Sequence, residues 1–391
     1  MIPRIFAAAL KTQLRSYPAV LLLGPRHCGK THILHDHFGS WKRLDLEKAS
    51  DLQLLSADPQ GVLAAHRDHL IIDEAQRFPE VFPVLRDAID RERRPGRYLL
   101  TGSVDPRLMP GVRETLPGRV GVIEMAPLLL AELQGHPAAL GSRWFWGGFP
   151  PLHRHEGAGG RSDWLGAYLA AVLERDIPAL GVRIPPARLL ALCRMLAHVH
   201  GGLLNLSELA ASLSVSHHTV DRHIGFLEGA FLVRRLQPYA ADIGKRLTRS
   251  PKLYIRDTGL LHHLAGLDSP AQLDDWPRRA ASWEGLIVEE IVRRVSLELP
   301  GAKAYFWRTQ AGCEVDLILE LGTRRIAVDI RLAADPRARS LQGLRQCLAD
   351  LRSAGGLVIH GGTEIERVGG GITLLPWREV LQPRFISMLG L

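Results

Sequence analysis

The first third of the chain alternates short apolar runs with segments of helical periodicity. Ala19–Leu23, Leu70–Ile72, Tyr98–Leu100 and Val120–Met125 are the apolar runs, and Val81–Arg91 is one of the amphipathic segments between them. Apolar strands separated by helices are typical of a parallel sheet that is covered on both faces. The pattern therefore predicts an α/β domain over residues 1–135.

Three further regions follow from changes in this pattern. Residues 136–185 begin with a stretch rich in Gly, Pro and aromatic residues and continue as a helical segment, which predicts a connector and helical lid. Residues 186–268 have mainly helical periodicity. Residues 269–391 begin with a helix at Trp283–Arg293 and then alternate strand-like and helical segments, which predicts a second α/β domain.

A phosphate-binding motif lies directly after the first apolar run. Residues 24–31 match the pattern G-x-x-x-x-G-K-[ST] and lead into a helical segment, which is the context that the motif requires. In such a loop backbone N–H groups point at the β-phosphate, the lysine reaches the β- and γ-phosphates, and the hydroxyl ligates Mg²⁺. The predicted ATP- and Mg²⁺-binding residues are Gly24, Pro25, Arg26, His27, Cys28, Gly29, Lys30 and Thr31.

Two acidic residues, Asp73 and Glu74, end the second apolar run. A carboxylate at the end of a buried strand can lie near the Mg²⁺ of a P-loop site, and a neighbouring glutamate can polarise the attacking water. The pair favours ATP hydrolysis over passive nucleotide binding. We therefore predict catalytic roles for Lys30, Asp73 and Glu74, with Asp73 also close to the metal.

Two further residues are candidates for a role at the γ-phosphate. The third apolar run ends in Thr101-Gly-Ser103, and Ser103 is the first choice for orienting the water because Thr101 lies earlier in the strand. Arg119 precedes the fourth run and is a candidate for an arginine that neutralises charge, either in its own chain or in a neighbouring subunit. A strand-end cap and an ordinary surface arginine are the alternatives for these two residues.

A helix-turn-helix pattern occupies residues 206–228. A short helix and a turn precede a second helix, in which Val220, Ile224 and Leu227 are expected to face inward. The segment Phe231–Leu236 would form the wing of a winged helix. Docking of a protein, or a purely structural role, is the alternative to DNA binding. The residues predicted to contact DNA are His217, His218, Arg222 and His223 on the outer helix face, with Arg234 and Arg235 in the wing.

Three carboxylates in the last region have the pattern of a metal site. Glu284 lies on a predicted helix, Asp316 on a strand, and Asp329 on the following strand, 13 residues later. Carboxylates in this arrangement can hold Mg²⁺, and Arg331 lies on the same strand face, as in PD-(D/E)XK nucleases. That position is normally lysine, and an arginine stays protonated and cannot act as a base. The pattern predicts a restriction-endonuclease-like fold that is catalytically silent, with active cleavage as the alternative.

Composition and charge add expectations about location and partners. The chain has 391 residues, 46% of them hydrophobic and 23% charged, and no apolar run approaches the roughly 18 residues needed to cross a bilayer. We therefore expect no membrane partner. The four cysteines are scattered without metal-binding spacing, which favours a reducing, cytoplasmic location. The net charge of +8 favours an anionic partner such as duplex or branched DNA.

Several segments together resemble a known family. They are the P-loop, Leu116–Val120, Gly147–Pro150, Glu174–Ile177, Lys245–Leu261 and Glu314–Asp316. The chain is similar to bacterial and archaeal AAA-type ATPases that carry a C-terminal domain of unknown function. The resemblance covers nearly the whole chain and implies an AAA-like ATPase core, a winged-helix region and a nuclease-like terminal fold. The family usually has Glu-x-Lys near the end, where this chain has Asp329-Ile-Arg331.

Three functional hypotheses follow. The leading one is a Mg²⁺-dependent ATPase that binds DNA and couples hydrolysis to remodelling of, or movement on, nucleic acid. The second is an ATP-dependent DNA nuclease, and the third is a nucleotide-controlled switch with a protein partner. Assembly into a homo-oligomer, such as a ring, would decide whether Arg119 acts on a neighbouring subunit.

Overall fold

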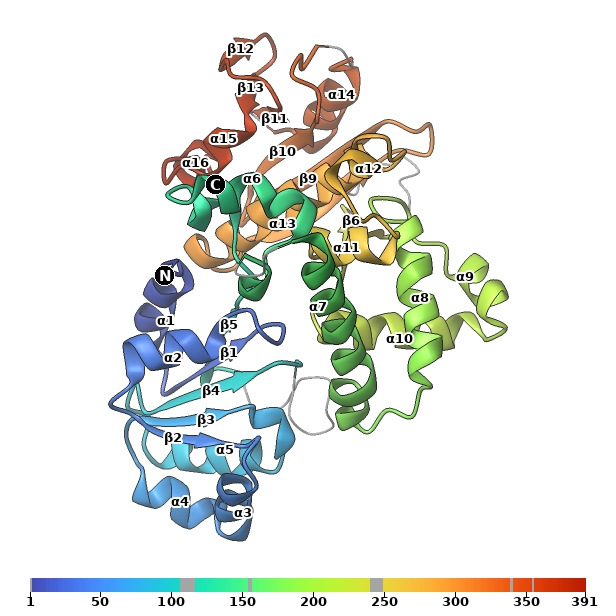
Figure 1. The fold of residues 1–391 in the computed structure, drawn as a ribbon. Coiled ribbons are helices and arrows are strands. Elements are labelled where there is room, and N and C mark those ends of the chain that lie inside the picture. The colour runs from blue at the N-terminus through green and yellow to red at the C-terminus, as the bar shows by residue number, and fades with distance from the viewer. Residues whose placement is uncertain (1, 106–116, 154–156, 240–248, 338–339, 354) are drawn as a thin grey trace.

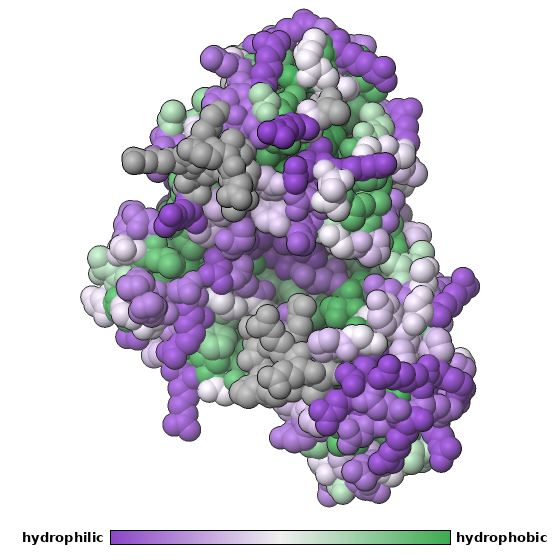
Figure 2. Space-filling view, turned by 180° about the vertical axis from the view of Figure 1, so that it is seen from behind, coloured by the Kyte–Doolittle hydropathy of each residue, from purple (hydrophilic) through white to green (hydrophobic). Residues whose placement is uncertain are grey.

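The computed structural model describes residues 2–105, 117–153, 157–239, 249–337, 340–353 and 355–391. Two segments used for the family resemblance extend beyond them, because Leu116 and residues 245–248 lie outside the described residues. An N-terminal sheet lies at one end of the molecule, a C-terminal sheet lies toward the other, and a group of helices lies beside both (Figure 1). From behind, hydrophilic side chains line a hollow near the middle (Figure 2). Within the described ranges, no helix is both long and apolar enough to cross a bilayer.

The N-terminal sheet is parallel throughout, with the strand order β2-β3-β4-β1-β5. Its strands are β1 (Ala19–Leu23), β2 (Lys42–Asp45), β3 (Leu70–Asp73), β4 (Tyr98–Gly102) and β5 (Val120–Glu124). Successive residues point to opposite faces, so Leu21 packs in one core cluster and Leu22 in another. The sheet is covered by α1 (Phe6–Leu14) and α2 (Lys30–Phe38) on one face and by α3 (Ala49–Ala57), α4 (Pro59–Ala65) and α5 (Val81–Arg91) on the other. The predicted parallel α/β domain is confirmed.

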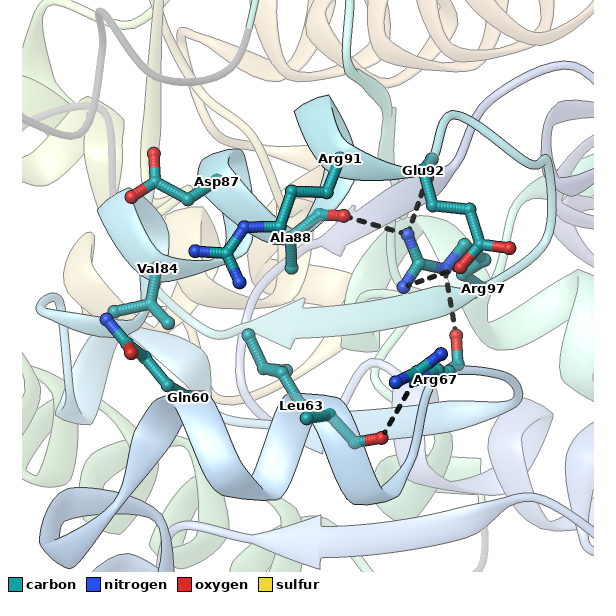
Figure 3. A pocket seen from close by; sticks show the side chains of 10 residues that line it. Gln60, Leu63, Arg67, Val84, Asp87, Ala88, Arg91, Glu92 and Arg97 are labelled. Carbon is teal, nitrogen blue, oxygen red and sulfur yellow. Dashed lines mark hydrogen bonds and ion pairs between the residues drawn. The ribbon is translucent and has the colours of Figure 1, made fainter.

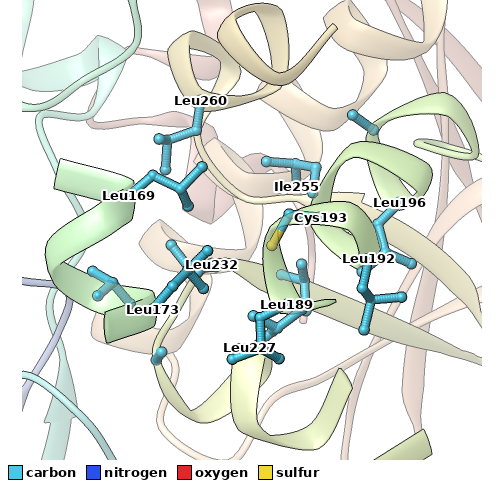
Figure 4. Close-up of a cluster of buried hydrophobic side chains, with 14 of the residues drawn as sticks. Leu169, Leu173, Leu189, Leu192, Cys193, Leu196, Leu227, Leu232, Ile255 and Leu260 are labelled. Atoms are coloured by element: carbon cyan, nitrogen blue, oxygen red, sulfur yellow. The ribbon is translucent and has the colours of Figure 1, made fainter. Parts of the chain in front are cut away.

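The middle of the chain is helical. Its helices are α6 (Pro137–Trp146), α7 (Ala158–Ala171), α8 (Pro186–His198), α9 (Leu206–Leu213), α10 (His217–Gly229), α11 (Thr258–Leu264) and α12 (Pro270–Asp274). A π-helical turn, η5 (Val172–Asp176), continues α7. Leu169 and Leu173, four residues apart on one face of this segment, share a hydrophobic core with Leu189 of α8 and Leu227 of α10 (Figure 4). The end of α7 is therefore packed directly against the helix-turn-helix segment.

The C-terminal sheet has eight strands of mixed direction, in the order β12-β13-β11-β10-β9-β8-β6-β7. Helix α13 (Arg279–Glu298) packs on one face and α14 (Gln342–Leu351) on the other. The short helices α15 (Trp377–Val380) and α16 (Phe385–Met388) close the chain. The strands are β6 (Val233–Pro238), β7 (Lys252–Ile255), β8 (Lys303–Arg308), β9 (Glu314–Leu321), β10 (Arg324–Ile330), β11 (Gly356–His360), β12 (Glu366–Val368) and β13 (Ile372–Pro376).

The strand expected as a wing belongs to this sheet. We predicted it at Phe231–Leu236, and β6 covers Val233–Pro238. The first part of β6 pairs antiparallel with β7, whereas Gln237 and Pro238 pair in parallel with β8. The helix-turn-helix segment and the C-terminal region are therefore connected through continuous backbone hydrogen bonding.

Charged side chains from all three regions meet in the interior. Glu289 of α13 accepts hydrogen bonds from Arg234 of β6 at 2.8 Å and from Arg256 at 2.7 Å. Glu124, the last residue of β5, lies 2.6 Å from Arg256 and 2.9 Å from Arg293 of α13. Buried carboxylates that lose such partners are strongly destabilising. The cluster consequently fixes the end of the N-terminal sheet against the other two regions.

Candidate functional site

The phosphate loop follows β1 at the carboxyl end of the N-terminal sheet, where its predicted residues are close together. Gly29 precedes α2 with a φ of 106°, a conformation that favours glycine. A Cβ atom at Gly24 would lie 2.3 Å from the carbonyl oxygen of Met125, so only glycine allows this close approach. Both glycines of the motif are thus required by the backbone itself.

Lys30 is the first residue of α2 and faces the inside of the loop. Its side chain is buried, and Nζ donates hydrogen bonds to the carbonyl oxygens of Gly24 at 2.7 Å and Pro25 at 3.1 Å. These weakly held contacts to neutral carbonyls can be replaced by a phosphate, because hydrogen bonds between two charged groups are stronger. Lys30 is placed for the phosphate contact that the motif predicts.

The predicted acidic pair lies at the end of β3, beside the end of β4. Asp73 ends β3, where it accepts hydrogen bonds from the guanidinium of Arg43 and from the hydroxyl of Thr101. Glu74 has a φ of 57°, and its backbone N–H donates to the Thr101 hydroxyl at 3.0 Å. Such left-handed non-glycine residues are uncommon. Thr101, our second choice in this strand, therefore contacts both acids.

Ser103, our first choice, contacts Glu74 directly. The Ser103 hydroxyl donates to Glu74 Oε2 at 2.6 Å, and the side-chain amide of Gln76 donates to the same oxygen at 2.6 Å. Burial raises the pKa of Glu74, but the charge of Lys30 and the bonds from Ser103 and Gln76 outweigh it, so the pKa is lowered. The carboxylate is ionised and oriented, as polarising a water molecule requires.

A cavity of about 590 Å³ opens over the phosphate loop. This volume lies within the range of small-molecule sites, roughly 300–1,000 Å³. The N-terminal segment, the loop and the connector all contribute to its wall. The residues that line it are Ile2, Arg4, Arg26, His27, Gly29, Lys30, Thr31, His32, Glu47, Glu74, Leu128, His136, Pro150, Pro151 and His153. Sequence reasoning missed the connector residues of this wall, because no local motif marks them.

Arg26 and His27 connect the loop to the helical region. Arg26 forms an ion pair with Asp176, the last residue of η5, at 2.9 Å. The ring of His27 makes edge contacts with Trp164 and Tyr168 of α7, with centroid separations of 5.9 and 6.4 Å. Asp176 was not among the predicted site residues, although it belongs to the Glu174–Ile177 segment of the family resemblance.

Arg119 is not brought to this site. It precedes β5, and its Nε and Nη2 donate to the carboxylate of Asp90 at 2.9 and 2.8 Å. Strands β1 and β5 are parallel. Arg119 therefore lies at the amino ends of the strands, whereas the phosphate loop lies at their carboxyl ends. The five residues of β5 separate the two ends of the strand by roughly 16 Å. The geometry does not support action of Arg119 within its own chain.

A second cavity, of about 360 Å³, also lies on the side of the amino ends of the strands. It is formed between α4 and α5, with Leu63, Ala88 and the side chains of Arg67 and Arg91 in its wall (Figure 3). Arg97 closes one side and donates to the carbonyl oxygens of Arg67 and Ala88. No predicted site residue lines this cavity.

The helix-turn-helix residues divide into exposed and buried ones. His217, His218 and Arg222 are exposed on α10. The prediction that His223 faces outward is wrong, because its side chain is 2% exposed. It follows Val220 by three residues and therefore lies on the same inner face.

The two arginines predicted in the wing are paired with carboxylates. Arg234 binds both oxygens of Glu289, at 2.8 and 3.1 Å. Arg235 donates to Glu228 at 2.7 Å and also pairs with Asp221. Phosphate contacts from these two guanidinium groups would have to compete with bound carboxylates.

The C-terminal carboxylates are held by cations of the chain itself. The ammonium of Lys252 lies 2.7 Å from Glu284, 2.5 Å from Glu314 and 3.3 Å from Asp316. Asp329 is instead paired with Arg331 at 2.6 Å. Among the residues that the structure describes, no group of three or more His, Cys, Asp or Glu side chains could hold a metal ion. The predicted metal site is therefore wrong, and Lys252 was missed because it lies 64 residues before Asp316.

Two other segments of the family resemblance bind each other. Asp257 accepts hydrogen bonds from the backbone of Gly148 at 2.8 Å and Leu260 at 3.1 Å. A Cβ atom at Gly147 would lie 2.1 Å from Asp257 Oδ1. The contact fixes the connector against α11, which is a structural function.

Three family models match the chain in succession. An AAA domain matches residues 16–134, a domain of unknown function (DUF8612) matches residues 138–271, and another domain of unknown function (DUF4143) matches residues 279–380. The second model covers the connector and the helical region together.

Similar proteins extend over almost the whole chain. Uncharacterized proteins of Mycobacterium tuberculosis and Mycobacterium bovis are each 38% identical over 377 residues, which cover 96% of this chain and 83% of each relative. A Walker-type ATPase of Pyrococcus abyssi superimposes with a TM-score of 0.46 at 15% identity, over 68% of this chain and 96% of that chain. This structural likeness is too low to establish a common fold over the matched length.

Proposed function

The chain belongs to a family of P-loop ATPases in which an AAA domain is followed by two domains of unknown function, and we propose that it hydrolyses ATP with Mg²⁺ and couples hydrolysis to DNA binding. One observation carries the hydrolytic part of the proposal. The Glu74 carboxylate, held by Ser103, lines the same cavity as Lys30 and Thr31 of the phosphate loop.

The residues of the site fit the proposed reaction. The oxygen of a water molecule bonds to the γ-phosphorus, the bond to the β,γ-bridging oxygen breaks, and ADP and phosphate leave with the proton of the water. Glu74 accepts a hydrogen bond from this water and orients it, while Ser103 and Gln76 hold the carboxylate. Lys30 stabilises charge on the β- and γ-phosphates.

The donor atoms near the loop also fit Mg²⁺. The hydroxyl of Thr31 and the carboxylate of Asp73 are hard oxygen ligands, which Mg²⁺ prefers together with phosphate oxygens and water. When bound, the ion would neutralise charge on the phosphates. Thr101 and Arg43 restrain Asp73 in this position.

DNA is the proposed partner of the helical region. Helices α8, α9 and α10 are followed by the β6–β7 pair, and an isolated bridge joins Leu203 to Lys252, which together fit a winged helix. His217, His218 and Arg222 give α10 an exposed polar face. The net charge of +8 adds a general attraction to phosphates.

Phosphate release by the wild type and by Lys30→Ala tests the ATPase proposal, and the variant is expected to be inactive. Turnover with duplex, forked and junction DNA tests the coupling, alongside DNA binding at about 0.15 M salt, where the Debye length is short. Stimulation by one of these DNAs supports coupling, and the absence of any binding refutes it.

A nucleotide-controlled switch is an outcome of the same measurements. It predicts turnover below about one per second, tight retention of nucleotide and no response to DNA. The geometry does not favour the nuclease hypothesis, because Lys252 and Arg331 already neutralise the carboxylates that would bind metal. Assembly into a ring is proposed only as the setting in which Arg119 would reach a neighbouring site.

A further inference from the structure

Arg26, within the phosphate loop, donates its side-chain hydrogen bonds among the described residues to carboxylates. Its Nε and Nη2 donate to the two oxygens of Asp176 at 2.9 and 3.0 Å, and Nη1 donates to Glu47 at 2.8 Å. The Arg26 side chain is 12% exposed and that of Asp176 is 6% exposed, so this fork-to-fork pair is shielded from water. Glu47 is more exposed and contributes less.

Arg26 and the proposed catalytic groups share one cavity. Arg26 lines the same cavity as Lys30, Thr31 and Glu74. Its charge, after that of Lys30, contributes to lowering the pKa of Glu74 against the opposing effect of burial. A positive charge that acts on Glu74 can also act on the phosphate that a Glu74-bound water attacks.

Arg4, which also lines the cavity, and Arg119, the arginine predicted for this role, have different surroundings. Arg4 donates to Glu132 at 2.9 Å and to the backbone carbonyls of Cys28 and Ala126, which fixes the loop from below. Arg119 lies at the amino ends of the strands, away from the phosphate loop. We therefore expect a phosphate to replace the carboxylates that are bound to Arg26.

Charge balance favours that replacement. One guanidinium faces two carboxylates, Asp176 and Glu47, and a bound triphosphate brings further negative charge into the same cavity. The planar guanidinium suits bidentate binding of phosphate as well as carboxylate. Asp176 and the phosphates would repel each other if both stayed close to Arg26.

We propose that Arg26 is a catalytic arginine supplied by the phosphate loop of the same chain, which exchanges Asp176 for the γ-phosphate when ATP binds. The inference rests on the proposed ATPase function and assigns to Arg26 the neutralisation of charge that develops on the γ-phosphate. Asp176 is a positioning residue that holds the guanidinium until the exchange.

The exchange has a consequence for the helical region. Asp176 ends the π-helical turn η5 and also lies 3.5 Å from the exposed Arg175. A buried carboxylate that loses its bidentate partner is less stable, so we expect this turn to shift when Arg26 leaves. Leu173 of the same turn packs in one core with Leu227 of α10 (Figure 4). Occupancy of the phosphate site is thereby transmitted to the helix-turn-helix segment.

Four variants of the full-length protein test the assignment: Arg26→Ala, Asp176→Asn, the double variant, and Arg183→Ala as a matched control from an exposed position. For each we would measure kcat, KM, affinity for a non-hydrolysable ATP analogue, and trapping of ADP with aluminium fluoride, which mimics the transferring phosphate. Arg26→Ala is expected to lower kcat by about 10³–10⁵-fold and to abolish trapping, with a much smaller change in analogue affinity. Asp176→Asn is expected to lower KM, and Arg183→Ala to match the wild type.

The double variant separates catalysis from structure, because it removes the buried carboxylate together with its partner. A double variant that stays as slow as Arg26→Ala supports the assignment. Recovery of the double variant to the wild-type rate, or wild-type kcat in Arg26→Ala, overturns it while leaving the ATPase proposal intact. A wild-type protein that binds no nucleotide with Mg²⁺ overturns both.

Discussion

Two groups of carboxylates, one beside the phosphate loop and one in the C-terminal region, differ in what holds them. In the N-terminal region, Glu74 is held by neutral groups, the Ser103 hydroxyl and the Gln76 amide. In the C-terminal region, the ammonium of Lys252 lies among Glu284 and its neighbours. A carboxylate held by neutral donors retains its charge for a substrate, whereas one beside a buried cation is already neutralised.

The difference teaches that acids of similar placement need not share a role. Glu74 lines a cavity of about 590 Å³ that also contains the phosphate loop, and the neighbouring Asp73 is paired with Arg43. Asp316 and Asp329 have the strand spacing of a metal site, yet internal cations occupy their oxygens. Glu74 and Glu284 differ in this respect, because neutral donors hold the first and an ammonium group contacts the second.

Replacing Glu74 by Gln should produce the largest effect. Gln keeps the size of the side chain but cannot polarise water as a carboxylate does, so kcat should fall by about 10²–10⁴-fold while ATP still binds. Phosphate release and nucleotide affinity are the measurements. Glu284→Gln is the matched control from the other group and should keep the wild-type kcat. Equal losses in the two variants would remove the distinction between the groups.

Replacing Lys252 by Met tests the structural group directly. The change leaves three carboxylates without their common ammonium, and it should lower the free energy of unfolding by about 3–5 kcal/mol. Urea unfolding measures this, with the exposed Lys303→Met as control. Unchanged stability of Lys252→Met would contradict a structural role.

The pH dependence of stability should carry the signature of the same group. Burial, together with the charge of Asp316, raises the pKa of Glu284 to about 7 despite Lys252. The folded state then binds more protons than the unfolded state between about pH 4.5 and 7, so stability falls as pH rises through this window, by about 3 kcal/mol. Unfolding by urea at several pH values should show the fall in the wild type and a smaller one in Glu284→Gln. If stability falls equally with pH in both proteins, another group causes the fall.

Arg222→Ala concerns the exposed face of α10 and should have a modest effect. Loss of one phosphate contact should weaken duplex binding about 3-fold to 10-fold and reduce the salt slope by about 1. Fluorescence anisotropy over a range of salt concentrations measures both, with Arg183→Ala as control. Identical slopes for the variant and the wild type would exclude Arg222 from the DNA contact.

Arg119→Ala should have the smallest effect. An arginine that only pairs with Asp90 at the surface contributes little, and kcat should change by less than about twofold in a monomer. A larger loss that is rescued by mixing with Lys30→Ala subunits would instead show action on a neighbouring site. The comparison must therefore be made at several protein concentrations.

The phosphate site could be predicted from the sequence because its parts are local. Gly24 to Thr31 form one continuous motif, and Asp73 and Glu74 directly follow an apolar strand. The parallel α/β fold of the first region could likewise be predicted, because apolar runs and helical periodicity depend on neighbouring residues. The hydroxyl residues at the end of β4 indicated Ser103 and Thr101, and both contact the acidic pair.

Other features depended on contacts between distant residues. Arg26 meets Asp176 across 150 positions, and Lys252 meets Asp316 across 64. We predicted His223 on the outer face of its helix, and packing in the helical region instead buries it. The sequence around a carboxylate does not indicate which distant cation will contact it in the folded protein.

The sequence by itself determined the nucleotide loop, the paired acids and the order of the regions, because each rests on short-range patterns of backbone and side chain. Only the tertiary structure decided which charges are neutralised inside the protein and which remain open to a ligand. The physical reason is that the electrostatic state of a buried group is set by whatever lies within a few ångströms in space, whatever its distance along the chain.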